Sequence, residues 1–249
     1  MNDLPRLLAA HRALLVVHAH PDDETLATGG LIAACTWQGV AVYVLTATRG
    51  EQGEVVPGSV TTEQARDLPG HREGEVACAG AALGVTGHGF LGELSARAVG
   101  RAPRRYTDSG MRWLDEAQTL AGPGSTAGPD ALTAAPADEI AADIAAYADA
   151  VGADLLITYD ADGGYGHPDH VALHQPTRAA ARALGVAFAE IASDPDADGT
   201  VVGGEQYRAA VVAALGCYRS QLSVDGADVV HVGGQRQPIR VSAVLRLRR

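Results

Sequence analysis

Two clusters of histidine and acidic residues follow apolar runs in this sequence. HAHPDDE, residues 18–24, comes directly after ALLVV at 13–17, and GYGHPDH, residues 164–170, follows DLLITY at 154–159. Imidazole nitrogens and carboxylate oxygens are good zinc ligands, and a catalytic zinc site uses three protein ligands and keeps a position for water. A free carboxylate beside the metal can take the proton of that water. The two clusters therefore predict a hydrolytic metal site.

The first cluster offers two ligands and a base. His20 and Asp23 are the candidate ligands, and Asp22 between them is the candidate base. Three histidines of the second region qualify as the third ligand on spacing alone: His167, His170 and His174. His18 points to the opposite side of the strand from His20, so we interpret it as a core or supporting histidine. PDDE alone could simply place favourable charge in the first turn of a helix, but the second cluster favours the metal site.

Alternating strands and helices position these clusters. Continuous apolar runs predict buried strands at 13–19, 40–48, 154–159 and 185–192. Helical spacing predicts helices at 24–38, 72–84, 136–151, 171–185 and 204–216. This alternation predicts an α/β, Rossmann-like fold with a mainly parallel sheet and helices on both faces. The active site is then expected at the carboxyl ends of the strands, where both clusters lie.

The chain is predicted to form a single domain over residues 1–249. Residues 97–135 are rich in Gly, Pro, Arg and small polar residues, with little periodicity. A loop this long in a compact domain is usually functional or disordered, so we expect it to be mobile. The C-terminal RLRR is interpreted as a solvated tail.

Charge and cysteine usage exclude several classes of protein. The net charge is −11, from 19 basic and 30 acidic residues, which argues against nucleic acid or an anionic membrane as partner. There is no apolar run of membrane-spanning length and no signal-peptide pattern, so a cytoplasmic protein is expected. Cys35, Cys78 and Cys217 are far apart and form no CxxC motif, so no disulfide framework is predicted. Dinucleotide binding is disfavoured because the acidic loop after the first strand would repel phosphate.

The pairing of AHPDDE (19–24) with HPDH (167–170) resembles the LmbE-like, or PIG-L, family of zinc-dependent N-deacetylases. The resemblance implies three metal ligands: His20, Asp23 and His170. It implies that Asp22 is the general base and that His167 assists the transition state, with Asp169 orienting or tuning His167.

Further stretches are similar to the mycothiol-pathway deacetylases, which act on N-acetylglucosaminyl-inositol: TRGEQGEV (48–55), LPGHREGEV (68–76), RRYTDSGM (104–111) and YDADGGYGHPDH (159–170). By this resemblance Arg72 and Asp108 bind sugar or inositol hydroxyls, and Tyr165 stabilises the oxyanion. Charge-assisted hydrogen bonds suit polyol recognition, and a tyrosine hydroxyl can donate to developing charge. The chain past residue 192 matches this branch only loosely, apart from YRSQ (218–221).

The sequence therefore predicts an enzyme with one Zn²⁺ per chain. It would hydrolyse the acetamide of a small N-acetylglucosaminyl substrate and release acetate and a free amine. Three alternatives stay open: a mycothiol-conjugate amidase, a deacetylase of a glycosylated natural product, and a zinc-binding module without catalysis. Iron or cobalt could occupy the same ligands. The sequence leaves the aglycone and any homo-oligomeric assembly undetermined.

Overall fold

A seven-stranded sheet forms the centre of the molecule in the computed structural model, which describes residues 5–115 and 120–248. Its strand order is β3-β2-β1-β6-β7-β12-β8. The strands are β1 (Ala13–His18), β2 (Ala41–Thr46), β3 (Gly87–Phe90), β6 (Leu155–Tyr159), β7 (Ala187–Ile191), β8 (Thr200–Gly203) and β12 (Ser242–Arg248). Strands β3, β2, β1, β6 and β7 pair in parallel, whereas β12 runs antiparallel to both of its neighbours.

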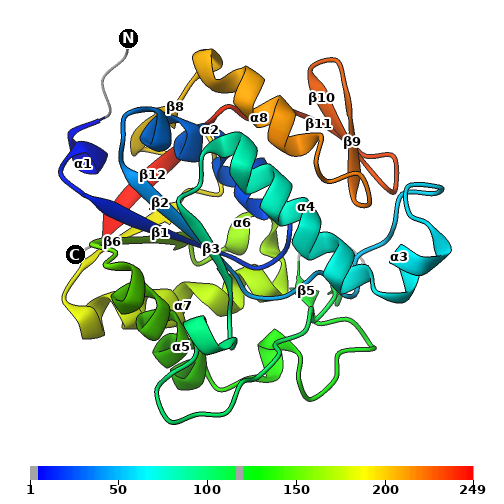
Figure 1. The fold of residues 1–249 in the computed structure, drawn as a ribbon, viewed down its shortest axis with the longest axis horizontal. Coiled ribbons are helices and arrows are strands. Elements are labelled where there is room, and N and C mark those ends of the chain that lie inside the picture. Colours follow the sequence, from blue (N-terminus) through cyan, green and yellow to red (C-terminus); the bar gives the residue numbers. More distant parts are fainter. Residues whose placement is uncertain (1–4, 116–119, 249) are drawn as a thin grey trace.

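Helices cover both faces of this sheet (Figure 1). One face carries α2 (Asp23–Trp37), α4 (Leu68–Leu83) and α8 (Arg208–Leu215), and the other carries α5 (Ala137–Val151) and α7 (Pro168–Leu184). Strand β1 shows how the sequence specifies the two layers. Its Leu14 and Val16 lie in the core with α2, α4 and α8, while Leu15 and Val17 lie in the core with α5 and α7. Successive side chains of a strand face opposite ways, so an all-apolar strand fills both cores.

The predicted α/β class, the mainly parallel sheet and the helices on both faces are confirmed. Helix α2 begins after Pro21 and ends just before Gly39, whose φ of 81° is easy for glycine. The strands β3, β8 and β12 were not expected. The C-terminal tail prediction is wrong, since residues 246–248 belong to β12 and pair with β7.

Smaller elements surround the sheet. Helices α1 (Arg6–Ala9), α3 (Thr62–Arg66) and α6 (Gly163–Gly166) are short, as are the 3-10 turns η1 (Leu94–Ala96), η2 (Leu132–Ala134) and η3 (Glu205–Tyr207). Strands β9 (Leu222–Asp225), β10 (Asp228–His231) and β11 (Arg236–Pro238) form an antiparallel sheet beside α8 and α4 (Figure 1).

Within the described ranges, no helix is long and apolar enough to cross a membrane.

Over its described residues, the predicted loop 97–135 has little regular structure: the strand pair β4 (Arg112–Trp113) and β5 (Ala121–Gly122) and the turn η2. Its first part is nevertheless anchored to α5. Arg97 donates to Glu139 and Asp143, and the Tyr106 hydroxyl donates to Asp143 at 2.7 Å. The mobility of the loop stays a prediction, and these contacts hold its residues 97 and 106 on α5.

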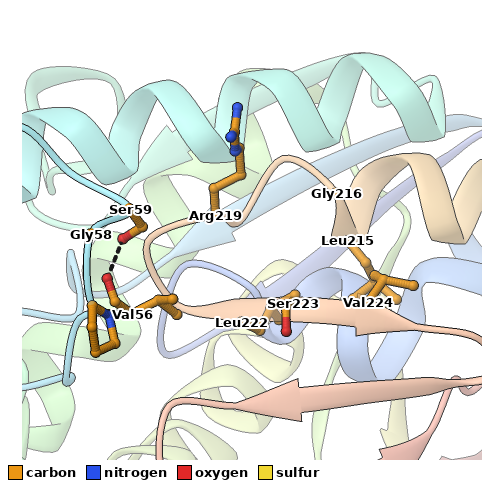
Figure 2. Close-up of a pocket in the computed structure, with 10 residues that line it drawn as sticks. Val56, Gly58, Ser59, Leu215, Gly216, Arg219, Leu222, Ser223 and Val224 are labelled. Carbon is orange, nitrogen blue, oxygen red and sulfur yellow. Dashed lines mark hydrogen bonds between the residues drawn. The ribbon is translucent and has the colours of Figure 1, made fainter.

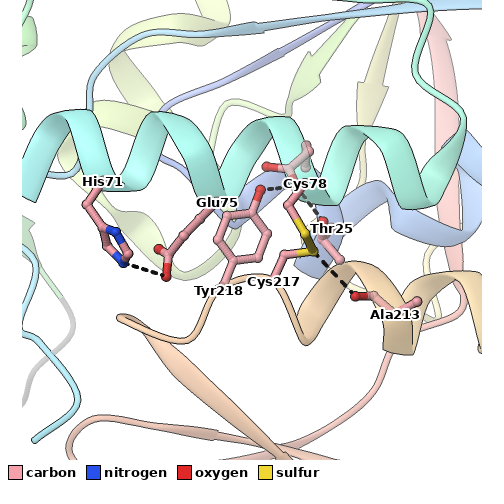
Figure 3. The surroundings of a disulfide bond; sticks show 8 residues. Thr25, His71, Glu75, Cys78, Ala213, Cys217 and Tyr218 are labelled. Carbon is pink, nitrogen blue, oxygen red and sulfur yellow. Dashed lines mark hydrogen bonds and ion pairs between the residues drawn. A yellow bond between two sulfur atoms is a disulfide. The ribbon is translucent and has the colours of Figure 1, made fainter. Parts of the chain in front are cut away.

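The disulfide prediction is wrong. Cys78 on α4 is bonded to Cys217, which follows α8, and Figure 3 shows this bond between the two elements. The Ala-rich surroundings of Cys35 and Cys78 predict that both are small buried apolar residues. This holds for Cys35, which is free and buried, but not for Cys78, which is exposed. The two bonded cysteines are 139 residues apart in sequence, so only the packing of α8 against α4 brings them together.

Candidate functional site

The two predicted clusters meet at one edge of the sheet. Strands β1 and β6 are parallel neighbours, with Leu14 opposite Leu155, so their carboxyl ends lie side by side. The loop after β1 carries residues 19–22 and leads into α2, while the loop after β6 leads through α6 into α7. Pro168 is the first residue of α7, a position that suits proline, whereas Pro21 lies just before Asp22, the N-cap of α2.

Asp23 contacts both His20 and His170, whose ring centroids are 5.3 Å apart. Asp23 Oδ2 is 3.2 Å from His20 Nδ1 and 3.2 Å from His170 Nε2. The ring nitrogens of His20, His167 and His170 also lie within 4.8 Å of one another. A second group, His20 with Asp108 and Asp169, meets the same distance limit. The site can therefore hold a metal ion, and His20 belongs to both groups.

The tautomer of His170 fits a metal ligand. Its Nδ1 lies 3.2 Å from the Gly163 carbonyl oxygen, which can only accept, so Nδ1 carries the proton. Its Nε2 is buried and makes no hydrogen bond to the described residues, although Asp23 Oδ2 lies 3.2 Å from it. A ring that donates through one nitrogen and turns the other lone pair toward a carboxylate is typical of a metal-binding histidine. A lone pair that faces a carboxylate oxygen is unfavourable, and a cation between the two would satisfy both.

Carboxylates surround His20. Asp169 Oδ2 lies 3.1 Å and Asp108 Oδ1 3.5 Å from its Nε2. Burial opposes protonation of His20, but hydrogen bonds to Asp108, Asp169 and Asp23 outweigh it and raise its pKa well above 6.5. Burial also raises the pKa of the Asp23 carboxyl, yet His170 and His20 bring it well below 3.8. This excess of carboxylate around imidazole suits a bound cation.

Tyr159 supports the site, and the sequence did not reveal it. Its hydroxyl donates to Asp23 Oδ2 at 2.8 Å and accepts from the Ala19 amide at 3.0 Å. His18 Nδ1 lies 3.0 Å from the same hydroxyl, so His18 is the supporting histidine that its strand position indicated. Burial lowers the pKa of His18 to about 4, which keeps the ring neutral.

Asp22 has a strained backbone and an available carboxylate. Its φ is 102°, the one positive value among the described non-glycine residues, and its side chain makes no capping hydrogen bond to α2. Burial raises the pKa of its carboxyl well above 3.8, and the neighbouring charges of Asp23 and Glu24 raise it further. A carboxylate with a raised pKa is a stronger base.

The rings of His167 and Tyr165 both lie near the His170 ring, with centroids 5.0 and 5.3 Å from it. His167 is the N-cap of α7, and its Nδ1 accepts from the Asp169 amide at 3.2 Å, which places the proton of the neutral ring on Nε2. Burial and the nearby His20 and His170 lower its pKa to about 4. The Tyr165 ring meets His170 edge-on at 5.3 Å and is 63% exposed. Both groups can therefore donate a hydrogen bond into the site.

Asp169 and His174 lie differently from what their motifs suggest. The Asp169 carboxylate contacts His20 and accepts from the Ser109 amide at 2.9 Å, while only its backbone amide contacts His167. It therefore orients the His20 ring directly. His174 Nε2 pairs with Glu190 at 2.8 Å instead of joining the cluster.

The two predicted substrate-binding residues differ in what they can offer. Asp108 is buried beside His20, and its Oδ2 accepts from the Gln52 amide at 3.1 Å. Arg72 is 1% exposed, and its guanidinium donates to the carbonyls of Gly50, Gly53 and Glu54. Arg72 therefore shapes the loop after β2, in addition to any contact with a ligand.

A cavity of about 250 Å³ opens beside Asp22. Its lining joins the Asp22 and Arg72 side to the small antiparallel sheet: Asp22, Gly53, Glu54, Arg72, Gln221, His231, Val232, Gly233 and Gln235. A second hollow, of about 340 Å³, lies between the loop at 56–59 and residues 215–224, where Ser59 donates to the Val56 carbonyl at 2.6 Å (Figure 2). None of the metal-capable residues lines this second hollow.

Comparison with known proteins identifies the family. The family model described as PIG-L, GlcNAc-PI de-N-acetylase, matches residues 15–181. The chain belongs to the PIG-L family. This confirms the resemblance that AHPDDE and HPDH indicated.

Three curated relatives of this chain are named 1D-myo-inositol 2-acetamido-2-deoxy-alpha-D-glucopyranoside deacetylase, one of them with the added number 1. The protein of Kineococcus radiotolerans is 45% identical over 67% of this chain and 44% of its own length. A Saccharopolyspora erythraea protein is 46% identical over 70% of this chain and 55% of its own length. That of Saccharomonospora viridis is 35% identical over 91% of each chain. The chain thus spans about half the length of the first two relatives.

Solved structures share the fold at lower identity. N,N'-diacetylchitobiose deacetylase from Pyrococcus horikoshii superposes with a TM-score of 0.66, at 17% identity, over 99% of this chain and 87% of its own. A teicoplanin deacetylase gives a TM-score of 0.53, at 21% identity, over 84% of each chain.

Proposed function

We propose that this PIG-L family chain is a zinc-dependent N-deacetylase that hydrolyses the acetamide of an N-acetylglucosaminyl substrate. The observation that carries the proposal is the Asp22 carboxylate, which makes no capping bond and stands beside the contact set of His20, Asp23 and His170. Mere metal binding needs no such carboxylate, whereas hydrolysis needs a base. The names of the relatives support deacetylation as the reaction.

One zinc ion per chain would be held by His20 Nδ1, Asp23 Oδ2 and His170 Nε2. The donor set fits zinc, since two imidazole nitrogens and one carboxylate oxygen are among its common ligands. When bound, zinc supplies Lewis acidity, which acidifies water and polarises a carbonyl oxygen. Asp169 and Tyr159 hold the rings and the carboxylate in place through the contacts described above.

The remaining residues move and hold protons. Asp22 would accept the proton of the attacking water, because its carboxylate has a raised affinity for protons. Tyr165 would donate to the oxyanion as the acetamide carbon becomes tetrahedral. Asp22, which then carries the proton taken from the water, or a protonated His167 would deliver a proton to the amine that leaves, and the lowered pKa of His167 favours Asp22 as this donor. An amide has no activated leaving group, so this last step is necessary.

The substrate would extend from His20 toward the cavity beside Asp22. Asp108, already next to His20, would accept hydrogen bonds from sugar hydroxyls, and Arg72 would complete the polar wall. We propose N-acetylglucosaminyl-inositol as the substrate, supported by the stretches shared with mycothiol-pathway deacetylases and by the names of the curated relatives.

A panel of N-acetylglucosaminides tests this proposal. Purified protein loaded with zinc is incubated with N-acetylglucosaminyl-inositol, with other N-acetylglucosaminides and with free N-acetylglucosamine, and the released amine is quantified. Fastest release from the inositol glycoside supports the proposed substrate. Preference for a glycosylated natural product or for a mycothiol conjugate would replace the substrate but keep the reaction. No amine release from any member, at full zinc occupancy, would overturn the deacetylase assignment.

A further inference from the structure

The backbone at Asp22 needs outside support. Its φ of 102° lies in a region that non-glycine residues rarely adopt, and its side chain makes no bond to the helix that it precedes. Such a conformation persists only when neighbouring groups hold it. Its carbonyl accepts from the Thr25 and Leu26 amides of α2 at 3.0 and 2.9 Å, and its amide donates to Glu24 Oε2 at 3.3 Å, so Glu24 is the side chain that supports it.

Glu24 is itself held from a distant part of the chain. Its carboxylate is 1% exposed, and Oε1 accepts from the hydroxyls of Thr25 and Tyr218, the latter at 2.5 Å. Tyr218 is fully buried and lies 194 residues away in sequence. A chain of hydrogen bonds thus runs from the Tyr218 hydroxyl through the Glu24 carboxylate to the Asp22 amide.

Tyr218 is firmly placed by its neighbours in the YRSQ stretch. The preceding Cys217 is bonded to Cys78 on α4. Two residues further on, the amide and the hydroxyl of Ser220 both donate to the Glu75 carboxylate of α4 at 2.7 Å. Figure 3 shows Glu75, Tyr218 and the disulfide together along α4. Tyr218 is therefore fixed to α4 on both sides, and a fixed donor can fix Glu24.

We infer that Tyr218 is a positioning residue for the base: through Glu24 it holds the Asp22 carboxylate in the orientation that accepts the proton. The expected effect on kcat rests on the proposed function, whereas the expected effect on the Asp22 backbone does not.

Tyr218→Phe tests this role because it keeps the ring and removes only the donor. We expect kcat to fall about tenfold, with KM for the N-acetylglucosaminide and zinc content unchanged, since neither substrate nor ligands touch Tyr218. The fall is moderate because Thr25 still donates to Glu24. The matched control is Tyr207→Phe, which removes a hydroxyl from the same core cluster without touching Glu24 and should leave kcat unchanged.

Combination with Asp22→Asn separates positioning from loss of packing. If Tyr218 acts through Asp22, Tyr218→Phe causes no further loss of kcat in the Asp22→Asn protein. An equal fractional loss in both backgrounds, or an unchanged kcat in the single variant, overturns the inference.

A crystal structure of the Tyr218→Phe protein gives a readout that needs no activity. We expect φ of residue 22 to leave the positive region or its carboxylate to adopt more than one orientation. An Asp22 geometry identical to that of the unsubstituted protein overturns the inference. Failure of the deacetylase proposal would instead appear as absent turnover in the unsubstituted protein, with this structural result unaffected.

Discussion

Opening the Cys78–Cys217 bond should destabilise the fold by a measurable amount. The cysteines are 139 residues apart, and the chain-entropy relation for a closed loop of that size gives about 5 kcal/mol at 25 °C. Native disulfides usually contribute about 2–4 kcal/mol, so the relation gives an upper figure. The loss of stability should come from the greater conformational entropy of the unfolded chain. The folded segment is still held on α4 by the hydrogen bonds between Ser220 and Glu75. For a chain of this size we expect Tm to fall by about 5–15 °C.

Thermal unfolding with and without a thiol reductant measures this loss. Reductant should lower Tm of the unsubstituted protein to that of Cys78→Ser, and should not change Tm of Cys78→Ser itself. Cys35→Ala is the matched control, since Cys35 is free and its removal should leave the response to reductant intact. Thiol titration in denaturant should find one thiol before reduction and three after it, given three cysteines in the chain. Three thiols without reductant, or an unchanged Tm once the bond is open, would refute this reasoning.

Three further predictions concern the metal, the pH and the aglycone. His170→Ala should lose most of its zinc by elemental analysis while His174→Ala retains it, because His170 Nε2 faces Asp23 in the cluster whereas His174 Nε2 is paired with Glu190; equal metal content would mean that the third ligand is misassigned. Burial and a nearby arginine lower the pKa of His88 to about 4, so the unfolded state binds a proton first as the pH falls below 6.5. The contribution of His88 to the free energy of unfolding should be complete above pH 6.5 and fall by at most about 3 kcal/mol toward pH 4. The free energy of unfolding of His88→Gln, measured with urea, should therefore decrease less steeply over this pH range, and an unchanged pH dependence would argue against His88 as a source. Gln235→Ala should raise KM for a glycoside with a polar aglycone but not for free N-acetylglucosamine, because Gln235 lines the cavity beside the site, whereas Gln237→Ala should change neither value; identical effects of the two substitutions would exclude a specific contact.

The candidate site could be predicted from the sequence because its histidine and acidic residues lie directly after apolar strands. Each cluster combines an apolar strand, a proline and candidate metal ligands within one short stretch, so the two clusters could be expected at neighbouring strand ends before the structure was known. The spacing left three histidines as the third ligand, and only the family resemblance selected His170. Parallel pairing of β1 and β6 then brought the two clusters together, as the fold class required.

Long-range contacts could not be read in the same way. Tyr159 ends a buried strand and looks like packing, yet its hydroxyl holds Asp23. Arg72 resembles a ligand-binding residue, but its guanidinium holds three loop carbonyls. The Cys78–Cys217 bond depends on which helices pack together, and that depends on contacts far apart in the chain.

The role of Asp22 is the central claim, and one measurement tests it directly: the rate of amine release by zinc-loaded Asp22→Asn beside that of the unsubstituted protein. Asn has nearly the same shape but cannot accept the proton, and Asp22 is not among the proposed ligands. We predict equal zinc content and a kcat lower by a factor of about 10²–10⁴, the usual contribution of general acid–base catalysis. Near-normal turnover by the fully zinc-loaded variant would contradict the account.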